Sequence, residues 1–528
     1  MIQHIKRLLG IGKPNPARGN SIVVNVEKLE RRVALLEDGV LEEYTVEREG
    51  DQNIVGGIFK GRVKNIEGGL KAMFVDIGLD KNAFLHFWDA IPAALDAGLE
   101  EIQREGKRKQ QKKISSKDIP DIYPIGSEIM IQVSKGMIGN KGPRVTTNVS
   151  LAGRYLVLMP FTEQFGISRK IEDPKERGRL RKIMRRLTVP EGMGIIMRTV
   201  AQGTRLRHFV RDLAMLLEQW REVERRRDSK AAPLCVFQEP GLIERTARDF
   251  LTDEIDQVIC DDLETTEFMR EVANRISRRA RRRISHISTA PQPIFEKFGV
   301  QKQIDEAFVR QVWLPCGGYI VVDETEALIS IDVNTGRNKG SKDVDKMILE
   351  TNIEAAHEVA RQLRLRNIGG LVVVDFIDMR HRRDQQAVYR AMKDRLKRDK
   401  AKTQVLQIST IGLMEMTRQR LQESLRDTMF EPCPYCQGRA RVKTTMTMSV
   451  EIQRRLNAVI QKHHEKAGDL IVVVSVDVLN RFKNEDSKLL GELERQHSGR
   501  LIFRADPSLH RERFAVIDAE TEKVMEKG

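Results

Sequence analysis

The sequence predicts a mixed α+β protein built from several domains, and three observations support this prediction. The chain has 528 residues, which is long for one hydrophobic core and favours three or more domains or subdomains. Residues 54–148 consist of short alternating apolar segments with glycines between them, a pattern typical of a small closed β-barrel. Residues 328–378 contain two apolar strand-like runs around a helix-patterned segment, which indicates two parallel strands joined by a crossover helix.

Residues 1–19 are predicted to form an extension before the first domain. Residues 1–13 place apolar side chains on one helical face, with basic side chains beside it: Ile2, Ile5, Leu8, Leu9, Lys6 and Arg7. Such a face could contact an anionic membrane surface. We favour the alternative of a short packing helix that ends at the glycines that follow. The pattern from Ile22 to Tyr44 then predicts a strand, a helix over KLERRVALLEDG and a second strand.

The predicted barrel contains candidate contacts for single-stranded nucleic acid. Barrels of the OB type bind single strands through a few aromatic residues and a basic face. The candidates are Phe74, Phe84, Lys135 and Lys141. The alternative for each phenylalanine is packing in the barrel core, where Phe is usually found. A polar insertion over residues 94–121 carries REGKRKQQKK, which is typical of a solvated segment and could add phosphate contacts.

Beyond the barrel, the run GMGIIMRTV ends a predicted strand with Arg198 and Thr199. A guanidinium group can bind a phosphate through two hydrogen bonds, and a hydroxyl group can add another. The pair is therefore a candidate site for a terminal phosphate, although two residues alone specify this only weakly.

The most informative residues are carboxylates at the ends of the two apolar runs. LISIDVN ends in Asp332 and Asn334, and LVVVDFID ends in Asp375 and Asp378. Neighbouring strands lie about 5 Å apart, and two carboxylates at that distance repel unless a proton or a cation lies between them. Magnesium binds through one or two carboxylates and takes phosphate as a further ligand. The pattern predicts a magnesium site for phosphate chemistry; the alternative is that these aspartates cap strand ends and open turns.

A second candidate metal site lies in CPYCQG, where Cys433 and Cys436 have the spacing of a zinc knuckle. A structural zinc ion needs four ligands, and the sequence contains no second CxxC. The simplest completion is the same pair in a second copy of the chain, which would make a homodimer around a shared zinc ion. His463 and His464 are the alternative ligands, and a metal-free turn is the remaining possibility.

The composition fits a nucleic-acid partner. The chain has 91 Lys and Arg against 76 Asp and Glu, for a net charge of +15, which favours a polyanion without specifying one. No apolar run is long enough to span a membrane. Five cysteines and the absence of a recognisable signal peptide predict a reducing, cytoplasmic location.

Taken together, SIDVNTG, ETNIEAAHEVARQLRLRNIGG, VVVDFIDM, GLMEMTRQR and CPYCQG resemble the catalytic region of the bacterial ribonuclease E/G family. The resemblance extends over nearly the whole chain from Ile22. The long scaffold tail of one branch is absent, so the chain is expected to lie nearer the ribonuclease G branch. The N-terminal extension and the basic barrel insertion depart from the family pattern, and neither touches the catalytic motif.

The resemblance implies an order of domains. These are an RNase H-like segment over 20–53, an inserted OB-fold barrel over 54–148, a 5′-phosphate sensor region over 149–243, an RNase H-like return over 244–307, a DNase I-like catalytic subdomain over 308–429, a zinc link over 430–443 and a small C-terminal domain over 444–528.

The resemblance also assigns roles to residues. Asp332 and Asp375 match the magnesium ligands, and Asn334 matches the amide that orients the second carboxylate. Gly153, Val157, Arg198 and Thr199 match the pocket for a 5′-monophosphate. Phe74, Phe84 and Lys141 match the barrel surface that holds RNA, and Cys433 and Cys436 match the shared zinc link.

The implied activity is magnesium-dependent endonucleolytic hydrolysis of single-stranded RNA, in rRNA processing and mRNA decay. The products would carry 5′-phosphate and 3′-hydroxyl ends, and substrates with a 5′-monophosphate would be favoured. The expected assembly is a homodimer, with a homotetramer as an extension of it. The alternatives are an RNA-binding assembly protein without catalysis and a nuclease that acts on DNA.

Overall fold

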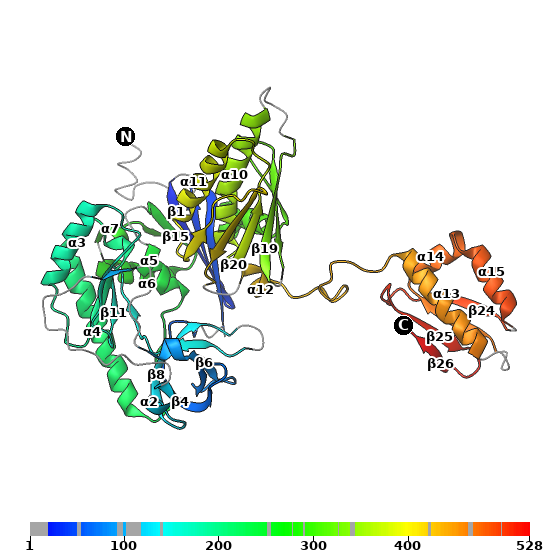
Figure 1. Ribbon diagram of the computed structural model, residues 1–528, viewed down its shortest axis with the longest axis horizontal. Helices are drawn as coiled ribbons and strands as arrows, with labels where there is room; N and C mark the ends of the chain where they lie inside the picture. The colour runs from blue at the N-terminus through cyan, green and yellow to red at the C-terminus, as the bar shows by residue number, and fades with distance from the viewer. Residues whose placement is uncertain are drawn as a thin grey trace. The chain divides into compact units, whose positions relative to one another are not determined.

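The structure is a computed structural model, and the chain divides into two compact units, Met1–Thr428 and Met429–Gly528 (Figure 1). It describes residues 19–49, 54–91, 99–101, 118–137, 141–250, 255–276, 278–288, 291–325, 327–337, 344–420, 424–462, 468–497 and 499–528. The predicted N-terminal helix face, most of the basic insertion, and His463 and His464 lie outside these residues. The mixed α+β architecture is confirmed. No helix in the described ranges is long and apolar enough to cross a membrane.

The first sheet of the larger unit is assembled from two distant segments of the chain. Its order is β16–β15–β1–β2–β3, in which β1, β15 and β16 are parallel and β1, β2 and β3 are antiparallel. The strands are β1 (Asn20–Val26), β2 (Glu30–Glu37), β3 (Val40–Arg48), β15 (Gln257–Cys260) and β16 (Ile284–His286). The associated helices are α5 (Leu242–Phe250), α6 (Leu263–Ile276), α7 (Arg278–Arg281), α8 (Ile294–Lys297) and α9 (Val300–Ala307). Everything between β3 and α5 is therefore an insertion into this sheet.

The predicted helix over KLERRVALLEDG is wrong, because this segment forms strand β2 and the turn after it. Asp38 and Gly39 have φ angles of 48° and 85°, and Glu37 pairs with Val40 across them. An Asp-Gly pair with two positive φ angles makes the two-residue hairpin turn that matches the twist of paired strands. That turn, together with pairing to β1 on the other side, outweighs the helical spacing of the apolar residues.

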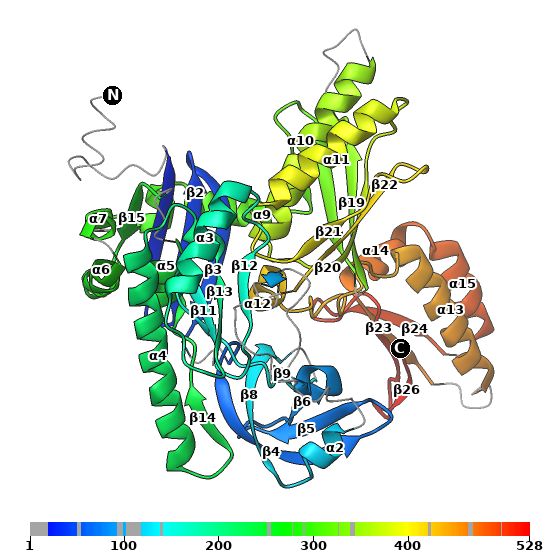
Figure 2. The ribbon, with the colours of Figure 1, turned by 60° about the vertical axis from the view of Figure 1, so that its left-hand side comes forward.

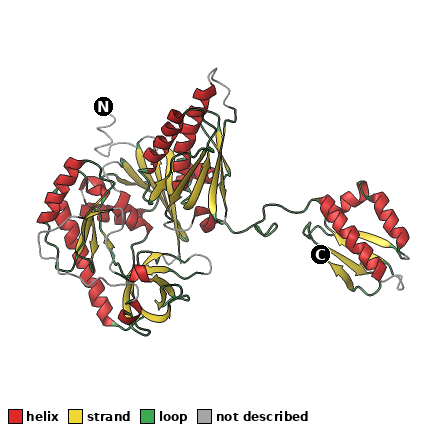
Figure 3. Cartoon of the chain, viewed as in Figure 1, coloured by secondary structure: helices red, strands yellow, loops and turns green. Residues whose placement is uncertain are grey.

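The predicted barrel is confirmed as a closed sheet of five strands in the order β4–β5–β6–β9–β8, closed by pairing of β4 with β8. Strands are drawn in yellow in Figure 3. The elements are β4 (Ile58–Glu67), β5 (Ala72–Asp76), β6 (Ala83–His86), η1 (Phe87–Ala90), α2 (Ile119–Ile122), β8 (Glu128–Lys135) and β9 (Arg144–Thr146). Strand β4 is long enough to pair with β8 through its first half and with β5 through its second. Strand β14 (Leu234–Phe237), from the next region of the chain, also joins β4.

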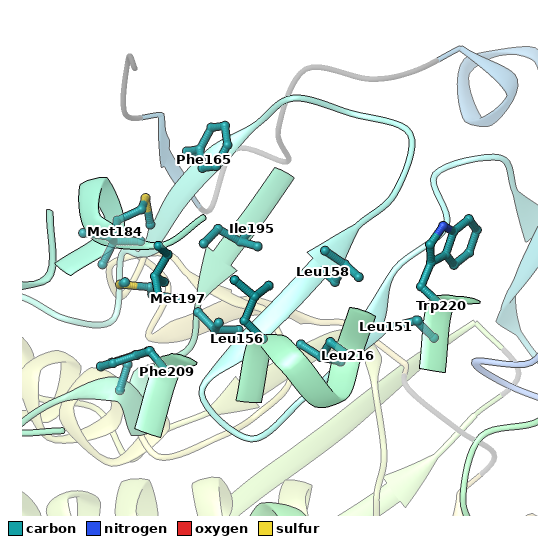
Figure 4. Close-up of a cluster of buried hydrophobic side chains, with 14 of the residues drawn as sticks. Leu151, Leu156, Leu158, Phe165, Met184, Ile195, Met197, Phe209, Leu216 and Trp220 are labelled. Carbon is teal, nitrogen blue, oxygen red and sulfur yellow. The ribbon is translucent and has the colours of Figure 1, made fainter. Parts of the chain in front are cut away.

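The region after the barrel forms a five-stranded sheet in the order β10–β11–β13–β12–β7. Its elements are β7 (Leu99–Glu101), β10 (Leu151–Ala152), β11 (Leu156–Met159), β12 (Phe165–Ser168), α3 (Pro174–Arg186), β13 (Gly194–Met197), η2 (Thr199–Ala201) and α4 (Leu206–Ser229). Helix α4 buries Phe209, Leu213, Leu216, Trp220 and Val223 at helical spacing. These side chains form one hydrophobic core with the apolar residues of β11 and β13 (Figure 4).

A six-stranded sheet in the order β17–β18–β19–β20–β22–β21 completes the larger unit. Its elements are β17 (Gln311–Trp313), β18 (Tyr319–Glu324), β19 (Leu328–Asn334), α10 (Val344–Leu365), β20 (Gly370–Asp375), α11 (Arg382–Leu396), β21 (Thr403–Val405), β22 (Leu413–Arg418) and α12 (Leu425–Met429). As predicted, β19 and β20 are parallel neighbours joined through helix α10. Helices α10 and α11 lie on one face of the sheet (Figures 1 and 2), where their apolar residues pack against alternate residues of β19 and β20. We call the other side of this sheet the open face.

Buried ion pairs join this six-stranded sheet to the first one. Glu42 of β3 is buried and contacts the guanidinium groups of Arg364 on α10 and Arg395 on α11, the latter at 2.7 Å. Arg361 donates to the carbonyl of Leu41 at 2.8 Å. Charged groups buried this deeply remain stable only when paired, so these contacts specify how α10 and α11 lie against β3.

The smaller unit has a four-stranded sheet in the order β24–β23–β25–β26, with β23 and β24 parallel. Its elements are α13 (Thr445–Lys462), β23 (Leu470–Val474), α14 (Val476–Asn484), α15 (Ser487–Gln496), β24 (Leu501–Ala505), β25 (Phe514–Asp518) and β26 (Val524–Lys527). Alternate residues of β23 are buried in a core that they share with α13 and α14, so this unit has a hydrophobic core of its own.

Candidate active site and RNA-contacting residues

Asp332 and Asp375 are directly opposite each other in the parallel pairing of β19 and β20. Ile331 and Val333 are buried on either side of Asp332, and Val374 is buried before Asp375, whereas both aspartates are exposed. Because side chains alternate between the faces of a strand, both carboxylates lie on the open face, away from α10 and α11. The structure thus brings together the two carboxylates that the sequence analysis singled out.

The amide of Asn334 also lies beside these carboxylates, but its observed partner differs from the expected one. Its Nδ2 donates to Oδ2 of Asp332 at 2.7 Å, whereas the resemblance implied that this amide orients the second carboxylate, Asp375. Residues two apart on a strand share a face, which explains the contact.

A residue that sequence reasoning missed forms hydrogen bonds to the loop after Asp375. Asn352 is fully buried on α10, where its Nδ2 donates to the carbonyl of Ile377 at 2.8 Å and its Oδ1 accepts from the Ile377 N–H at 3.1 Å. These two bonds hold the backbone two residues beyond Asp375. The available signal was an amide in the middle of the alanine-rich helix face, NIEAA, where an apolar residue is expected.

The carboxylate pair is chemically suited to magnesium. No group of three or more His, Cys, Asp or Glu side chains in the described ranges is arranged to hold a metal ion. Magnesium, however, commonly binds through only one or two protein carboxylates and keeps several water ligands. Two exposed carboxylates in register, with an amide that fixes one of them, meet that requirement.

Phe74 and Phe84 lie on the outside of the barrel rather than in its core. They are opposite each other on β5 and β6, half-buried, with ring centroids 5.9 Å apart in an edge-on arrangement. Phe84 is also paired in register with Arg144, which is paired with Lys135. Phe74, Phe84, Arg144 and Lys135 therefore form one row across four strands, the barrel row.

Lys141 is exposed just before β9. Two exposed residues of the barrel were missed by the sequence analysis: Arg144, in the barrel row, and Trp88, in η1 directly after β6. Trp88 is 64% exposed and lies in the aromatic run FLHFWD, a signal that sequence reasoning had available. Arg144 has no such local signal, because only the strand register brings it next to Phe84.

The predicted phosphate pocket is partly assembled. Arg198 donates to the carbonyl of Gly153 at 2.5 Å and to Asp249 at 2.8 Å, and its backbone N–H donates to Tyr155. Val157 pairs with Ile196 on the neighbouring strand, and Thr199 follows Arg198 at the start of η2. Burial by itself raises the pKa of Asp249, but the guanidinium groups of Arg198 and Arg248 lower it below the usual value. Asp249, which sequence reasoning missed, therefore neutralises Arg198.

Cys433 and Cys436 lie in the turn expected for a zinc knuckle. The Gln437 N–H donates to the Cys433 carbonyl at 2.7 Å, and the Arg439 N–H donates to the Cys436 carbonyl at 3.0 Å. Gly438 has a φ of 80°, which suits glycine. Backbone N–H groups of Cys436 and Tyr435 lower the pKa of the Cys433 thiol. A thiolate is the form that binds zinc, so the turn is chemically suited to zinc, for which two thiolates would be half of a four-ligand set.

The zinc-knuckle turn is attached to the smaller unit. The His510 ring lies 4.1 Å from the Tyr435 ring, and its Nε2–H donates to the Tyr435 carbonyl at 2.6 Å. Arg439 pairs with Glu512 at 2.6 Å. These contacts hold both cysteines against the loop between β24 and β25.

A basic chain with a closed barrel, an outward-facing row of aromatic and basic side chains on that barrel and paired carboxylates on an open sheet face has the features of a nuclease. Residues 150–421 match the ribonuclease E/G family, and residues 432–521 match the thioredoxin-like domain of RNase E/G proteins. Ribonuclease G of Escherichia coli strain K12 is 37% identical over 497 residues, which cover 94% of this chain and 99% of that protein.

Two further relatives agree with this assignment. Ribonuclease G of Haemophilus influenzae is 35% identical over 506 residues, which cover 94% of this chain and 99% of that protein. Ribonuclease E of Escherichia coli strain K12 is 36% identical over 471 residues, which cover 89% of this chain and 43% of that protein. The chain belongs to the ribonuclease E/G family and is an endoribonuclease, as the sequence motifs indicated. Its C-terminal domain is thioredoxin-like. Nucleases of this family are metal-dependent.

Proposed function

We propose that this endoribonuclease cleaves single-stranded RNA by magnesium-dependent hydrolysis and leaves 5′-phosphate and 3′-hydroxyl ends. The observation that carries the proposal is the register of β19 and β20, in which Asp332 is opposite Asp375 on an open face. Substrates would include precursors of rRNA and mRNAs that are being degraded. The five free cysteines support a reducing compartment, for which we propose the cytoplasm.

In this proposal Asp332 and Asp375 hold the magnesium ion. When bound, the ion lowers the pKa of a water ligand and neutralises charge on the phosphate. Asn334 fixes the Asp332 carboxylate, as its 2.7 Å hydrogen bond suggests. Asn352 fixes the loop after Asp375.

RNA binding is assigned to the barrel row and Lys141, because aromatic stacking with nearby cations holds single strands without reading sequence. A 5′-monophosphate would bind at Gly153, Val157, Arg198 and Thr199. There it would replace Asp249 as the partner of Arg198, and the preference for monophosphorylated RNA would follow from that exchange.

The finer domain assignments are part of the same proposal. We assign the first sheet to an RNase H-like domain, the barrel to the OB fold and the six-stranded sheet to a DNase I-like subdomain, with the boundaries given above. The division of the chain after Thr428 supports a boundary before the zinc link. We further propose that two chains share one zinc ion through Cys433 and Cys436, which gives a homodimer and allows a homotetramer.

The first prediction tests the carboxylate pair. Asp332→Asn and Asp375→Asn each remove a charge that holds the metal without changing side-chain size, so each should abolish cleavage of a single-stranded RNA of mixed sequence. RNA affinity, measured by filter binding in EDTA, should stay close to wild type because the barrel row is untouched. A DNA strand of the same sequence should remain uncut by the wild-type enzyme.

Asp394→Asn is the matched control, because Asp394 is an exposed aspartate on α11, on the other face of the sheet. Asp394→Asn should cut RNA at the wild-type rate, and EDTA should stop RNA cleavage by both proteins. Near-normal cleavage by both active-site variants at millimolar magnesium would refute the metal assignment.

A further inference from the structure

Two aromatic side chains lie on the open face of the six-stranded sheet, in line with Asn334 and two residues along the strands from Asp332. Trp313 on the edge strand β17 is opposite Tyr319 on β18, and Tyr319 is opposite Asn334 on β19. The Trp313 and Tyr319 ring centroids are 5.3 Å apart, with the ring planes at 61°. Side chains of directly opposite residues share a face of the sheet, so both rings lie on the face that carries Asp332 and Asp375.

The distance from the rings to the carboxylates is short. Adjacent strands are about 4.8 Å apart, so Trp313 lies two strand spacings, about 10 Å, from Asn334. Asn334 in turn is hydrogen-bonded to Asp332. Trp313 is therefore within reach of a nucleotide close to the phosphate that the carboxylates would act on.

Trp313 combines an exposed ring with a cationic neighbour. Its residue surface is 54% exposed, and the guanidinium group of Arg337 lies 5.7 Å from its ring centroid. Arg337 is exposed, and in the described ranges no carboxylate forms an ion pair with it. A large exposed aromatic side chain next to a free cation is the combination with which proteins hold single-stranded nucleic acid.

The backbone holds Arg337 in this position. Gly336 has a φ of 54°, and a Cβ atom there would lie 2.6 Å from the Gly317 carbonyl and 3.1 Å from the Tyr319 ring. The Arg337 N–H donates to the same Gly317 carbonyl at 2.9 Å. The chain thus turns sharply after β19 and runs against the hairpin between β17 and β18.

We propose that Trp313, Tyr319 and Arg337 form a base-binding subsite of the active site. The base of a nucleotide within two positions of the scissile phosphate stacks on Trp313, Tyr319 holds the indole ring edge-on, and Arg337 contacts the phosphate of that nucleotide. The subsite rests on the proposed role of Asp332 and Asp375 for its position relative to the chemistry. The stacking itself does not depend on that role.

The kinetic test compares Trp313→Ala with Trp313→Phe on a 5′-monophosphorylated RNA that has one cleavage site. Loss of one stacked base should raise KM about 5- to 150-fold for Trp313→Ala, while Trp313→Phe, which keeps a ring, should stay near wild type. Phe268→Ala removes an aromatic residue that is 42% exposed on α6, remote from this face in the fold, and should have no effect.

A second test changes the RNA substrate instead of the protein. Four RNAs each carry one abasic nucleotide, at the first or second position on either side of the scissile phosphate. The KM for each RNA is measured with wild type and with Trp313→Ala. At the position that stacks, the difference between the two enzymes should disappear. Equal KM values of wild type and Trp313→Ala on the intact RNA, or a difference that persists at all four abasic positions, would overturn the proposal.

A binding readout separates this proposal from the catalytic one. The chain has three tryptophans, and of the two that remain in Trp88→Phe, Trp220 is 2% exposed and Trp313 is 54% exposed. Uncut RNA added in EDTA should therefore quench the fluorescence of Trp88→Phe. If RNA quenches the fluorescence of Trp88→Phe but Asp332→Asn still cleaves RNA at the wild-type rate, only the metal assignment is refuted. If Asp332→Asn is inactive but RNA does not quench the fluorescence of Trp88→Phe, only the stacking is refuted.

Discussion

Arg198 is held in one orientation by its neighbours, which matters for its proposed role in phosphate binding. Its guanidinium group is held by the Gly153 carbonyl and by Asp249, and Asp249 is also paired with Arg248 at 3.0 Å. The pKa of Asp249 is lowered, so the ionised pair stabilises the fold above the ordinary Asp pKa, and that stabilisation is lost as the pH falls through the lower folded-state value. Near neutral pH the side chain of Arg198 is therefore already oriented by Asp249.

At this scale we predict that Arg198→Ala removes the preference for 5′-monophosphorylated RNA. Wild type should cut monophosphorylated RNA faster than the same RNA with a 5′-hydroxyl. One charge-assisted hydrogen bond contributes about 1.5–3 kcal/mol, so the advantage should be about 10- to 100-fold. Competition cleavage assays with both RNAs measure the ratio directly.

The control for that prediction is Arg185→Ala, which removes an exposed arginine of α3 and should keep the ratio. If wild type itself cuts the two RNAs equally, Arg198 has only the structural role of holding Gly153.

At the scale of elements, local sequence signals predicted some structures well and failed for others. The apolar runs around Asp332 and Asp375 predicted parallel strands in register, because a strand buried on one face and joined by a helix of that length has few other arrangements. Residues 28–39 were predicted to be helical because the spacing of their apolar residues suits a helix. Pairing with both neighbours and the Asp-Gly turn made them a strand instead.

Helix α10 has a second role, which leads to the next prediction. Asn352→Ala leaves the N–H and carbonyl groups of Ile377 without their partner, and each unpaired buried group costs about 1–3 kcal/mol. Because those groups fix the loop after Asp375, kcat should fall more than RNA affinity changes. Asn352→Asp, which keeps the acceptor for the Ile377 N–H, should recover part of kcat.

Val359→Ala on the same helix is the control, because Val359 is also fully buried but packs in the hydrophobic core. It should lower the thermal stability and leave kcat unchanged at a temperature where all variants are folded. A matching loss of kcat in Val359→Ala would mean that Asn352 acts only through stability.

At the scale of the whole molecule, the fold interleaves segments that are distant in sequence. The first sheet combines residues 20–48 with residues 257–286, so the barrel and the sheet after it are insertions. Two strands also cross the predicted boundaries: β7, from the barrel insertion, pairs with β12, and β14, from the following region, pairs with β4. Such exchanges join neighbouring domains and make their boundaries less sharp than the sequence pattern suggested.

Assembly gives the last prediction. One CxxC per chain supplies two thiolates, so a zinc ion shared by two chains requires half an equivalent of zinc per chain. Metal analysis and analytical ultracentrifugation should find that ratio in a dimer. Cys433→Ala should lose zinc and weaken the dimer at low protein concentration, because zinc binding and association are then linked.

Cys235→Ala is the control, since Cys235 is an exposed free thiol on β14 and should keep both zinc and dimer. One full equivalent of zinc in a monomer would exclude the shared site and leave the nuclease assignment intact.

The sequence by itself determined the family, the mixed α+β class, the barrel, the carboxylate pair and the cysteine turn. The barrel and the cysteine turn depend on residue types at short spacings, which the local geometry of strands and turns sets. The carboxylate pair was predictable because two apolar runs joined by a helix favour adjacent parallel strands. Only the tertiary structure decided that Phe74 and Phe84 face outward, that Arg144 extends their row, that Asp249 neutralises Arg198, and that Trp313 shares the open face with Asp332. Each of these depends on strand register or on contacts between distant segments, and the periodicity of a segment indicates which face is buried without indicating what will lie against it.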